Sequence, residues 1–225
     1  MKKFHLRKTL LINQLIFERR MEMATERDLE KVKAYVDSDG LIHVENAIIK
    51  SKNFAGDEIR DPNNPKKIVN SEGNRNFSLE LNQEAADLIS SYRLADYPDR
   101  GFKVQVRMPK PDAEDQTPRI FLTVKVKYRY DEKGRPYRRN PKIRQYSNNG
   151  VTEKDENTVA TVDEVYIDKA EVTFSPYPYD VNGNIGLSAY LVQMNYKIKE
   201  NDMNSKWDQD YMTDDPTDFE EVPFA

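Results

Sequence analysis

Polar and apolar residues alternate along several short segments of the chain, and a two-residue period is typical of half-buried β-strands. The clearest segment is Arg119–Tyr130, which reads RIFLTVKVKYRY. One face of this strand would carry Ile120, Leu122, Val124, Val126 and Tyr128. The other would carry Arg119, Phe121, Thr123, Lys125, Lys127 and Arg129. Further strands are expected at residues 41–54, 75–81, 102–108, 165–180 and 187–199, with a returning segment at 137–147.

Two segments show helical spacing instead. Asn82 is a good helix cap and predicts a helix over residues 83–92. Residues 24–36 predict a second short helix, which the DSDG turn would end. The glycine-rich turn at residues 182–186 predicts a hairpin between the last two strands. The polar segment 57–74 is expected to be a long loop, and a polar stretch at residues 148–157 precedes the last two strands.

These elements predict a mainly β fold, an OB-fold-like barrel with one inserted helix. An immunoglobulin-type sandwich is the alternative, although its cysteine–tryptophan signature is absent. The domain would span residues 41–199, after an N-terminal helical extension at 1–40 and before a disordered acidic tail at 200–225. The apolar stretch of residues 9–17 is interrupted by polar residues and lacks a cleavage site, so neither export nor a membrane partner is expected.

Composition argues against most enzyme classes. The chain has no cysteine and only two histidines, His5 and His43, which disfavours thiolate chemistry, histidine-built metal sites and catalytic triads. No phosphate-binding glycine loop and no nucleophile elbow is present. We therefore expect a non-enzymatic protein without a cofactor or bound metal. A magnesium-dependent nuclease built from scattered carboxylates is the enzymatic alternative.

The charges are strongly segregated along the chain. Residues 100–146 contain fourteen Lys and Arg against five Asp and Glu, a balance of +9, whereas residues 200–225 contain nine acids against Lys206, a balance of −8. A basic interior with an acidic tail favours nucleic acid as the partner. A half-exposed strand can carry lysines outward for solubility alone, so the alternation by itself does not decide.

Aromatic residues among the cations make single-stranded nucleic acid the favoured ligand. Cations can follow the phosphates while rings stack on unpaired bases. Phe54 ends a strand beside a glycine, where we expect its ring to be partly exposed. The predicted binding residues are Phe54, Arg75, Phe121, Lys125, Lys127, Arg129, Tyr137, Arg138 and Arg139.

The tail ends in DDPTDFEEVPFA, which places a small apolar group after a run of acids. So acidic a segment cannot bury enough apolar surface to fold by itself, and it could serve only for solubility. Two functions are more specific. The acids could compete with nucleic acid for the basic groove, and the apolar end could recruit a partner as a short motif that orders on binding.

Spaced motifs over residues 41–199 resemble phage-type single-stranded DNA-binding proteins with an oligonucleotide-binding fold. They are NFAG, GNRNFSLEL, RIFLTVKVKY and TFSPYPYDVNGNIGLSAYLVQM. The ending DFEEVPFA is similar to the acidic tip of bacterial single-stranded DNA-binding proteins, except that Ala225 follows the phenylalanine. The resemblance implies a tip that docks on replication or repair proteins. Its residues here would be Asp218, Phe219, Glu220, Glu221, Val222, Pro223 and Phe224.

The sequence thus predicts a protein that coats and protects single-stranded DNA during phage replication or recombination, in the cytoplasm of the bacterial host cell. Two other classes stay open. One is an RNA-binding or strand-annealing protein, and the other is a phage protein-interaction module that counters host defence. The chain could act as a monomer or as a homo-oligomer.

Overall fold

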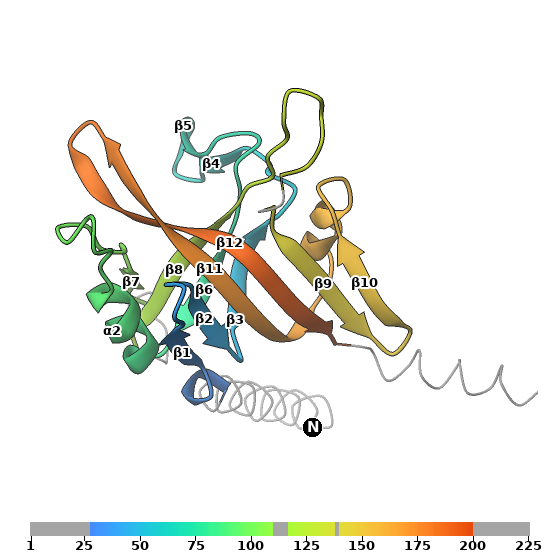
Figure 1. Cartoon of the computed structure of the whole chain (residues 1–225), viewed down its shortest axis with the longest axis horizontal. Helices are drawn as coiled ribbons and strands as arrows, with labels where there is room; N and C mark the ends of the chain where they lie inside the picture. Colours follow the sequence, from blue (N-terminus) through green and yellow to red (C-terminus); the bar gives the residue numbers. More distant parts are fainter. Residues whose placement is uncertain (1–27, 110–116, 138–139, 200–225) are drawn as a thin grey trace, which may run out of the picture.

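The computed structural model describes residues 28–109, 117–137 and 140–199, and within these ranges the chain is mainly β, as predicted (Figure 1). The strands are β1 (Lys33–Val36), β2 (Ile42–Glu45), β3 (Ile48–Asn53), β4 (Ile59–Asp61), β5 (Asn64–Asn70), β6 (Arg75–Leu81), β7 (Gln105–Arg107), β8 (Arg119–Val126), β9 (Lys142–Ser147), β10 (Gly150–Lys154), β11 (Ile167–Val181) and β12 (Asn184–Ile198). The helical elements are α2 (Gln83–Ser91) and the 3₁₀ turn η1 (Val159–Asp163), and residues 28–30, within the helix predicted over residues 24–36, are helical as well.

One large sheet contains most of the strands, in the order β1-β2-β11-β12-β8-β6-β3. Neighbours along this path are antiparallel, except that β12 pairs with β8 in parallel. Beyond that contact, β12 pairs with β9, which in turn pairs with β10. β7 lies on β8, and β4 and β5 form a separate hairpin. The hairpin predicted between the last two strands is confirmed as β11 and β12.

The two ends of the sheet are linked by a single run of chain. β2 pairs with β11, and β3, only three residues later, pairs with β6. Between them Asn46 has a positive φ of 49°, and Ala47 donates its backbone N–H to the carbonyl of Ala170 at 2.8 Å. Because of the bend at Asn46, one continuous extended run of chain pairs with two different strands, β11 and β6.

The hydrogen-bonded sheet itself is not closed. In the described part of the chain no strand pairs with the second edge of β3, so the sheet curves round without completing its ladder. Continuity of the backbone from β2 to β3 brings the ends together instead. The predicted barrel is therefore an open one, which agrees with the partly open five-stranded barrel of oligonucleotide-binding folds.

The core lies inside this curved sheet. Alternate residues of β6, β8, β11 and β12 point into it, and the largest fully buried side chains include Phe54, Phe77, Phe174 and Tyr196. Burial raises the pKa of the Tyr196 phenol to about 12, and its hydroxyl donates to Gln145 Oε1 at 2.9 Å. The buried hydroxyl is therefore satisfied by an adjacent strand.

The predicted helix after Asn82 is confirmed as α2. The Asn82 side chain accepts a hydrogen bond from the Ala85 backbone N–H at 2.9 Å and donates one to the Val32 carbonyl at 2.8 Å. This one amide therefore caps the helix and joins it to the segment just before β1. Ala85, Ala86 and Ile89 form the buried side of α2. No helix of the described ranges is long and apolar enough to span a membrane.

Several local predictions were wrong in a consistent way. Residues 33–36 are strand β1 rather than the end of a helix, because they pair with β2. The polar segment predicted as a long loop contains the β4–β5 hairpin, and the polar stretch at residues 148–157, for which no strand was predicted, contains β10. The strand expected at residues 102–108 is reduced to β7. In each case pairing with a neighbour decides the conformation, and local composition does not report that pairing.

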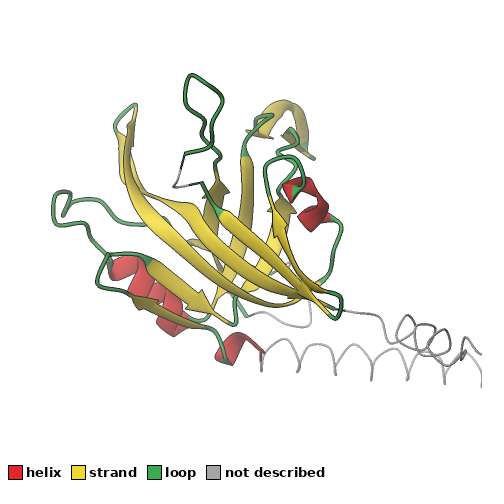
Figure 2. Cartoon of the chain, turned by 45° about the vertical axis from the view of Figure 1, so that its right-hand side comes forward, coloured by secondary structure: helices red, strands yellow, loops and turns green. Residues whose placement is uncertain are grey.

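Three segments rise from the same end of the sheet in both views (Figures 1 and 2). They are the far end of the β11–β12 hairpin, the β4–β5 hairpin and the connection between β8 and β9. The β11–β12 hairpin turns through Asn182 and Gly183, both at positive φ (53° and 78°).

The bend at Asn46 gives a test of this architecture. A β-branched residue is strained at positive φ by about 1–2 kcal/mol, whereas glycine is not. Asn46→Val should therefore lower the free energy of unfolding by more than Asn46→Gly, although both lose the 3.0 Å hydrogen bond from the Asn46 side chain to the Lys31 carbonyl. Urea denaturation of the three proteins measures this. Equal losses in the two variants would contradict the proposed importance of the bend.

Candidate nucleic-acid interface

Lys125 lies at the centre of a polar surface on the outside of the sheet. Its neighbours along β8, Val124 and Val126, are buried in the core, so Lys125 points outward. In the sheet register it stands opposite Asn76 of β6 on one side and Tyr190 of β12 on the other. The lysine is solvent-exposed and thus keeps its charge at the surface.

Two tyrosine rings accompany this charge. The Lys125 ammonium lies 5.6 Å from the centroid of the Tyr190 ring and donates a hydrogen bond to Ser188 Oγ at 3.1 Å. The ring of Tyr177 on β11 meets Tyr190 edge-to-face at 5.7 Å, and Tyr177 is 53% exposed. We call Lys125, Lys127, Tyr177 and Tyr190 the Lys125 face. It combines mobile positive charge with an accessible ring.

Sequence reasoning missed both tyrosines of this face. TFSPYPYD alternates in the same way as the strand around Lys125, and this period could have placed Thr173, Ser175 and Tyr177 on one outward side. Tyr190, however, is brought beside Lys125 only by the parallel pairing of β12 with β8. Such long-range register cannot be read from local periodicity.

The connection from β8 to β9 extends the basic surface. Lys127 and Arg129 are exposed as it leaves β8, and Tyr137 is 54% exposed on its return. Its base is ordered, because the Asn140 side chain bonds both the N–H and the C=O of Arg129, at 2.8 and 2.9 Å. The predicted site residues Lys127, Arg129 and Tyr137 thus lie together, next to Lys125.

Asp131 holds the tip of this connection. The backbone N–H of Arg135 donates to its carboxylate at 2.8 Å and, as the largest cause, holds the pKa of Asp131 below its usual value. The Arg135 guanidinium pairs with the same carboxylate at 2.8 Å. This exposed ion pair partly neutralises Arg135, so the accessible charge of the connection lies nearer its base.

Arg75 has a different environment from the other predicted cations. Its guanidinium pairs with Glu156 Oε1 at 2.9 Å and lies 5.8 Å from the ring centroid of Tyr128. Burial is the main cause that raises the pKa of the Tyr128 phenol, so this ring stays neutral beside the ion pair. Arg75 thus joins the start of β6 to the segment after β10, and its charge is already matched by a carboxylate.

Phe54 and Phe121 were both predicted to stack on bases, and the structure buries both. Phe54 is fully buried and stacks on Phe77 with 5.2 Å between centroids, so its expected partial exposure is wrong. Phe121 is 6% exposed, because β7 pairs with β8 at this position and places the Arg107 guanidinium 4.7 Å from the Phe121 ring centroid. Neither ring has a free face in this conformation.

The remaining predicted residues lie outside the described ranges. They are Arg138 and Arg139, together with the tail residues Asp218, Phe219, Glu220, Glu221, Val222, Pro223 and Phe224. The N-terminal extension lies outside them up to residue 27. Their assigned roles stay predictions.

Carboxylates of the described chain serve structural roles where their contacts are known. Asp163, one of the acids that the nuclease alternative would use, accepts hydrogen bonds from the backbone N–H groups of Phe54 and Ala55 at 3.0 and 2.8 Å. It therefore fixes the end of β3. Within residues 28–109, 117–137 and 140–199, no group of three or more His, Asp or Glu is arranged to hold a metal ion.

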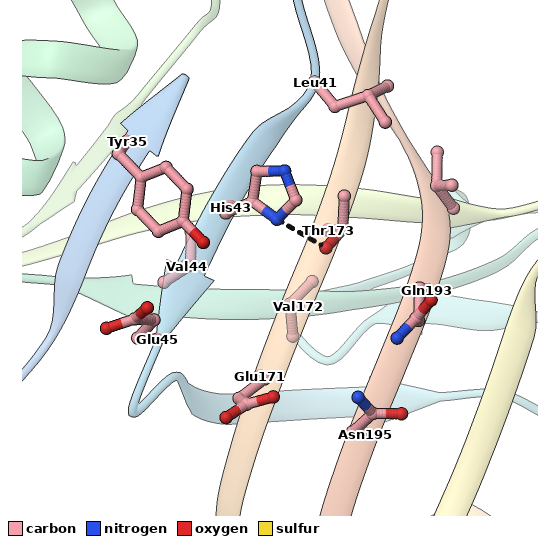
Figure 3. A pocket seen from close by; sticks show the side chains of 11 residues that line it. Tyr35, Leu41, His43, Val44, Glu45, Glu171, Val172, Thr173, Gln193 and Asn195 are labelled. Atoms are coloured by element: carbon pink, nitrogen blue, oxygen red, sulfur yellow. Dashed lines mark hydrogen bonds between the residues drawn. The ribbon is translucent and has the colours of Figure 1, made fainter. Parts of the chain in front are cut away.

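A pocket of about 290 Å³ lies on the outside of β1, β2, β11 and β12 (Figure 3). The His43 ring stacks on Tyr35 at 4.8 Å and lies within hydrogen-bonding distance of Asp37 and of Thr173, at 2.8 and 3.0 Å. The carboxylates of Glu45 and Glu171 line the same pocket. Their negative charge would repel phosphates, so we do not assign this pocket to the interface.

The burial of Phe54 gives a second testable prediction. Removing a buried phenylalanine ring typically costs about 3–5 kcal/mol, so Phe54→Ala should lower the free energy of unfolding by that order. Phe54→Leu, which keeps most of the volume, should cost less. Binding of oligonucleotides per folded molecule should be unchanged in Phe54→Leu. A stable Phe54→Leu protein with weakened binding would instead show that the ring contacts the ligand.

Comparison with known proteins gives two findings. The family model described as "Putative phage ssDNA-binding domain" matches residues 32–221, and no curated protein sequence matches the chain. Among solved structures, the chain is similar to the single-stranded DNA-binding protein from bacteriophage Enc34 in complex with ssDNA, at 12% identity and a TM-score of 0.40, over 76% of this chain and 98% of that one. The same phage protein without DNA matches at 11% identity and a TM-score of 0.40, over 76% and 92% of the two chains.

Proposed function

We propose that the chain, which belongs to the phage ssDNA-binding domain family, binds single-stranded DNA through the Lys125 face and the basic connection that follows it. The observation that carries this proposal is the register of β8 with β12, which sets the exposed Lys125 beside the ring of Tyr190, and Tyr190 in turn contacts the exposed ring of Tyr177.

The chemistry of this surface fits an unpaired strand better than a duplex. Stacking on a base requires an open aromatic face, and bases in a duplex are already stacked on one another. Tyr177 offers such a face, while Lys125 and Lys127 can neutralise phosphates. Because neither phosphates nor ring faces distinguish one base from another, we expect little sequence preference.

The family and the surface support a protein that coats and protects DNA without transforming it. We place its action in phage DNA replication or recombination, in the cytoplasm of the host cell, where single strands are exposed. An RNA-binding or strand-annealing activity would use the same surface. The three activities can be distinguished, because an RNA-binding protein would prefer RNA over DNA and an annealing protein would accelerate the pairing of complementary strands.

The first test is a titration of the full chain with fluorescent oligothymidine, a matched duplex and a matched RNA over a range of salt concentrations. We expect the tightest binding to single-stranded DNA, with log affinity falling by roughly 0.7 per contacted phosphate for each tenfold rise in salt. Preference for RNA, or accelerated annealing of complementary strands, would favour the alternative activity. Binding that is indifferent to salt would contradict the proposal.

Substitutions on the Lys125 face test whether this surface, rather than another part of the chain, binds the single strand. Tyr177→Ala should weaken binding by about 1–3 kcal/mol, roughly five- to 150-fold, if one base stacks on this ring. Tyr177→Phe keeps the ring and is the matched control. Lys125→Gln should reduce the salt slope by about 0.7, whereas Lys125→Arg should preserve it. Unchanged affinity and slope in Tyr177→Ala and Lys125→Gln would exclude this face.

We further propose that the end of the tail, residues 218–224, recruits replication or recombination proteins. The support is its composition, in which acids precede Val222, Pro223 and Phe224. A short apolar end on a charged segment can bind a pocket with basic rims. This proposal concerns a separate part of the chain from the Lys125 face, so the two can fail independently.

Replacing Phe224 by alanine tests the recruiting role. Phe224→Ala should reduce binding of the full chain to purified host replication and recombination proteins by at least the roughly fivefold expected for a contact of about 1 kcal/mol, because the ring supplies most of the apolar surface at the tip. Its affinity for oligothymidine should stay unchanged. Thr217→Ala is a suitable control within the tail. Equal binding of Phe224→Ala and the unchanged chain by every partner tested would exclude the tip as a docking motif.

A further inference from the structure

A lysine-rich groove lies at the open seam of the sheet, away from the Lys125 face. It has a volume of about 570 Å³ and is lined by residues of the β2–β3 run, the segment before β11, and β11 itself. Five lysines line it, namely Lys31, Lys50, Lys52, Lys169 and Lys199, against two acids, Asp28 and Asp168. Lys50 is also paired with the buried Glu80 at 3.9 Å, so the groove carries a net formal charge of +2 once this third carboxylate is included. We refer to it as the seam groove.

The seam groove exists because the sheet does not close. Ala47 bonds the carbonyl of Ala170, and beyond this point β3 and β11 diverge without further pairing. β3 pairs with β6 on one side only, so its other edge presents backbone groups towards the groove. An edge of this kind can accept an extended segment of chain.

The groove is both basic and partly apolar. Ile48, Ile49 and Ile167 line it and are only partly buried, so aliphatic surface lies between the lysines. The Lys52 ammonium is held inside by the carbonyls of Val162 and Val165, and desolvation lowers its pKa. Lys169 and Lys199 are exposed at the rim. An extended peptide with alternating acids and aromatic side chains would match this lining.

We propose that the seam groove binds the first part of the chain's own acidic tail, residues 200–211. This segment follows directly after Lys199, which lines the groove. It contains four acids, Glu200, Asp202, Asp208 and Asp210, against Lys206, and this net charge of −3 is opposite in sign to the charge of the groove. It also contains Trp207 and Tyr211, which can cover the aliphatic floor.

Tethering favours this occupant over any free ligand. A segment joined to the rim by a few residues reaches an effective concentration of about millimolar at the groove. Residues 1–27, which precede Asp28 in the sequence, carry seven Lys and Arg against three Glu, so their charge does not complement that of the groove. Docking of residues 200–211 leaves residues 218–224 outside the groove and open to partners.

Trp207 is the only tryptophan of the chain, so its fluorescence reports directly on this contact. In the full chain at low salt, Trp207 should be protected from quenching by acrylamide. The double substitution Lys169→Glu and Lys199→Glu should remove that protection. Salt near 1 M, where the Debye length is about 3 Å, should remove it in the unchanged chain as well.

The matched control reverses the same number of charges on the Lys125 face, by Lys125→Glu with Lys127→Glu. It should leave Trp207 protected while it weakens binding to oligothymidine. The seam double variant should remove the protection of Trp207 without weakening binding to oligothymidine. Loss of protection in the Lys125 face variant alone would place the tail on the DNA-binding surface and overturn the proposal. So would a seam variant that binds oligothymidine more weakly with Trp207 unchanged, since the groove would then be a DNA surface.

Protection that depends on protein concentration would also overturn it, because the tail would then dock on a second copy. Failure of this proposal is separable from failure of the proposed function. If the Lys125 face variant binds oligothymidine normally, the proposed DNA surface is wrong, whatever Trp207 shows. If Trp207 stays protected in the seam double variant while the Lys125 face variant binds oligothymidine more weakly, the proposed DNA surface stands and the groove has another role.

Discussion

The whole architecture depends on one extended run of chain that pairs with two strands. Residues 42–47 bond β11 and residues 48–53 bond β6, and this sharing bends the sheet around its core. A continuous straight strand would pair along its full length with one neighbour and leave the sheet flatter. The positive φ of Asn46 is therefore the local feature that permits the curved shape.

The same bend has two consequences for the outer surface. Where the curved sheet brings β12 beside β8, the two strands pair in parallel over a short contact, and the Lys125 face forms there. Because the ladder stays open beyond Ala47, the edge of β3 is left facing β11 and the seam groove forms between them. The two basic surfaces thus arise from one constraint, although they lie on different parts of the sheet and have different linings.

Much of the fold could be predicted from the sequence where local signals were sufficient. Alternation located β6 and β8, Asn82 located the start of α2, and the turn at residues 182–186 located the last hairpin. Local signals failed for β1. They also failed for the β4–β5 hairpin, because its polar sequence does not show the two-residue alternation of a strand. The candidate site was predicted only in part, because local signals do not report pairing between distant strands. Lys125 and Lys127 follow from alternation, but the burial of Phe54 and the position of Tyr190 depend on strands distant in sequence.

Phe121 shows why charge and aromaticity in sequence overstate a binding surface. Its place on the charged face of β8 was read correctly, yet three residues of β7 pair beside it and Arg107 covers its ring. Arg75 is likewise basic and correctly placed at the start of β6, but Glu156 already neutralises it. Whether a ring is exposed or a charge is available depends on which other residues pack against it. The surface that we propose for DNA binding is consequently smaller than the basic segment of the sequence, and it is concentrated where β8 is left uncovered, around Lys125.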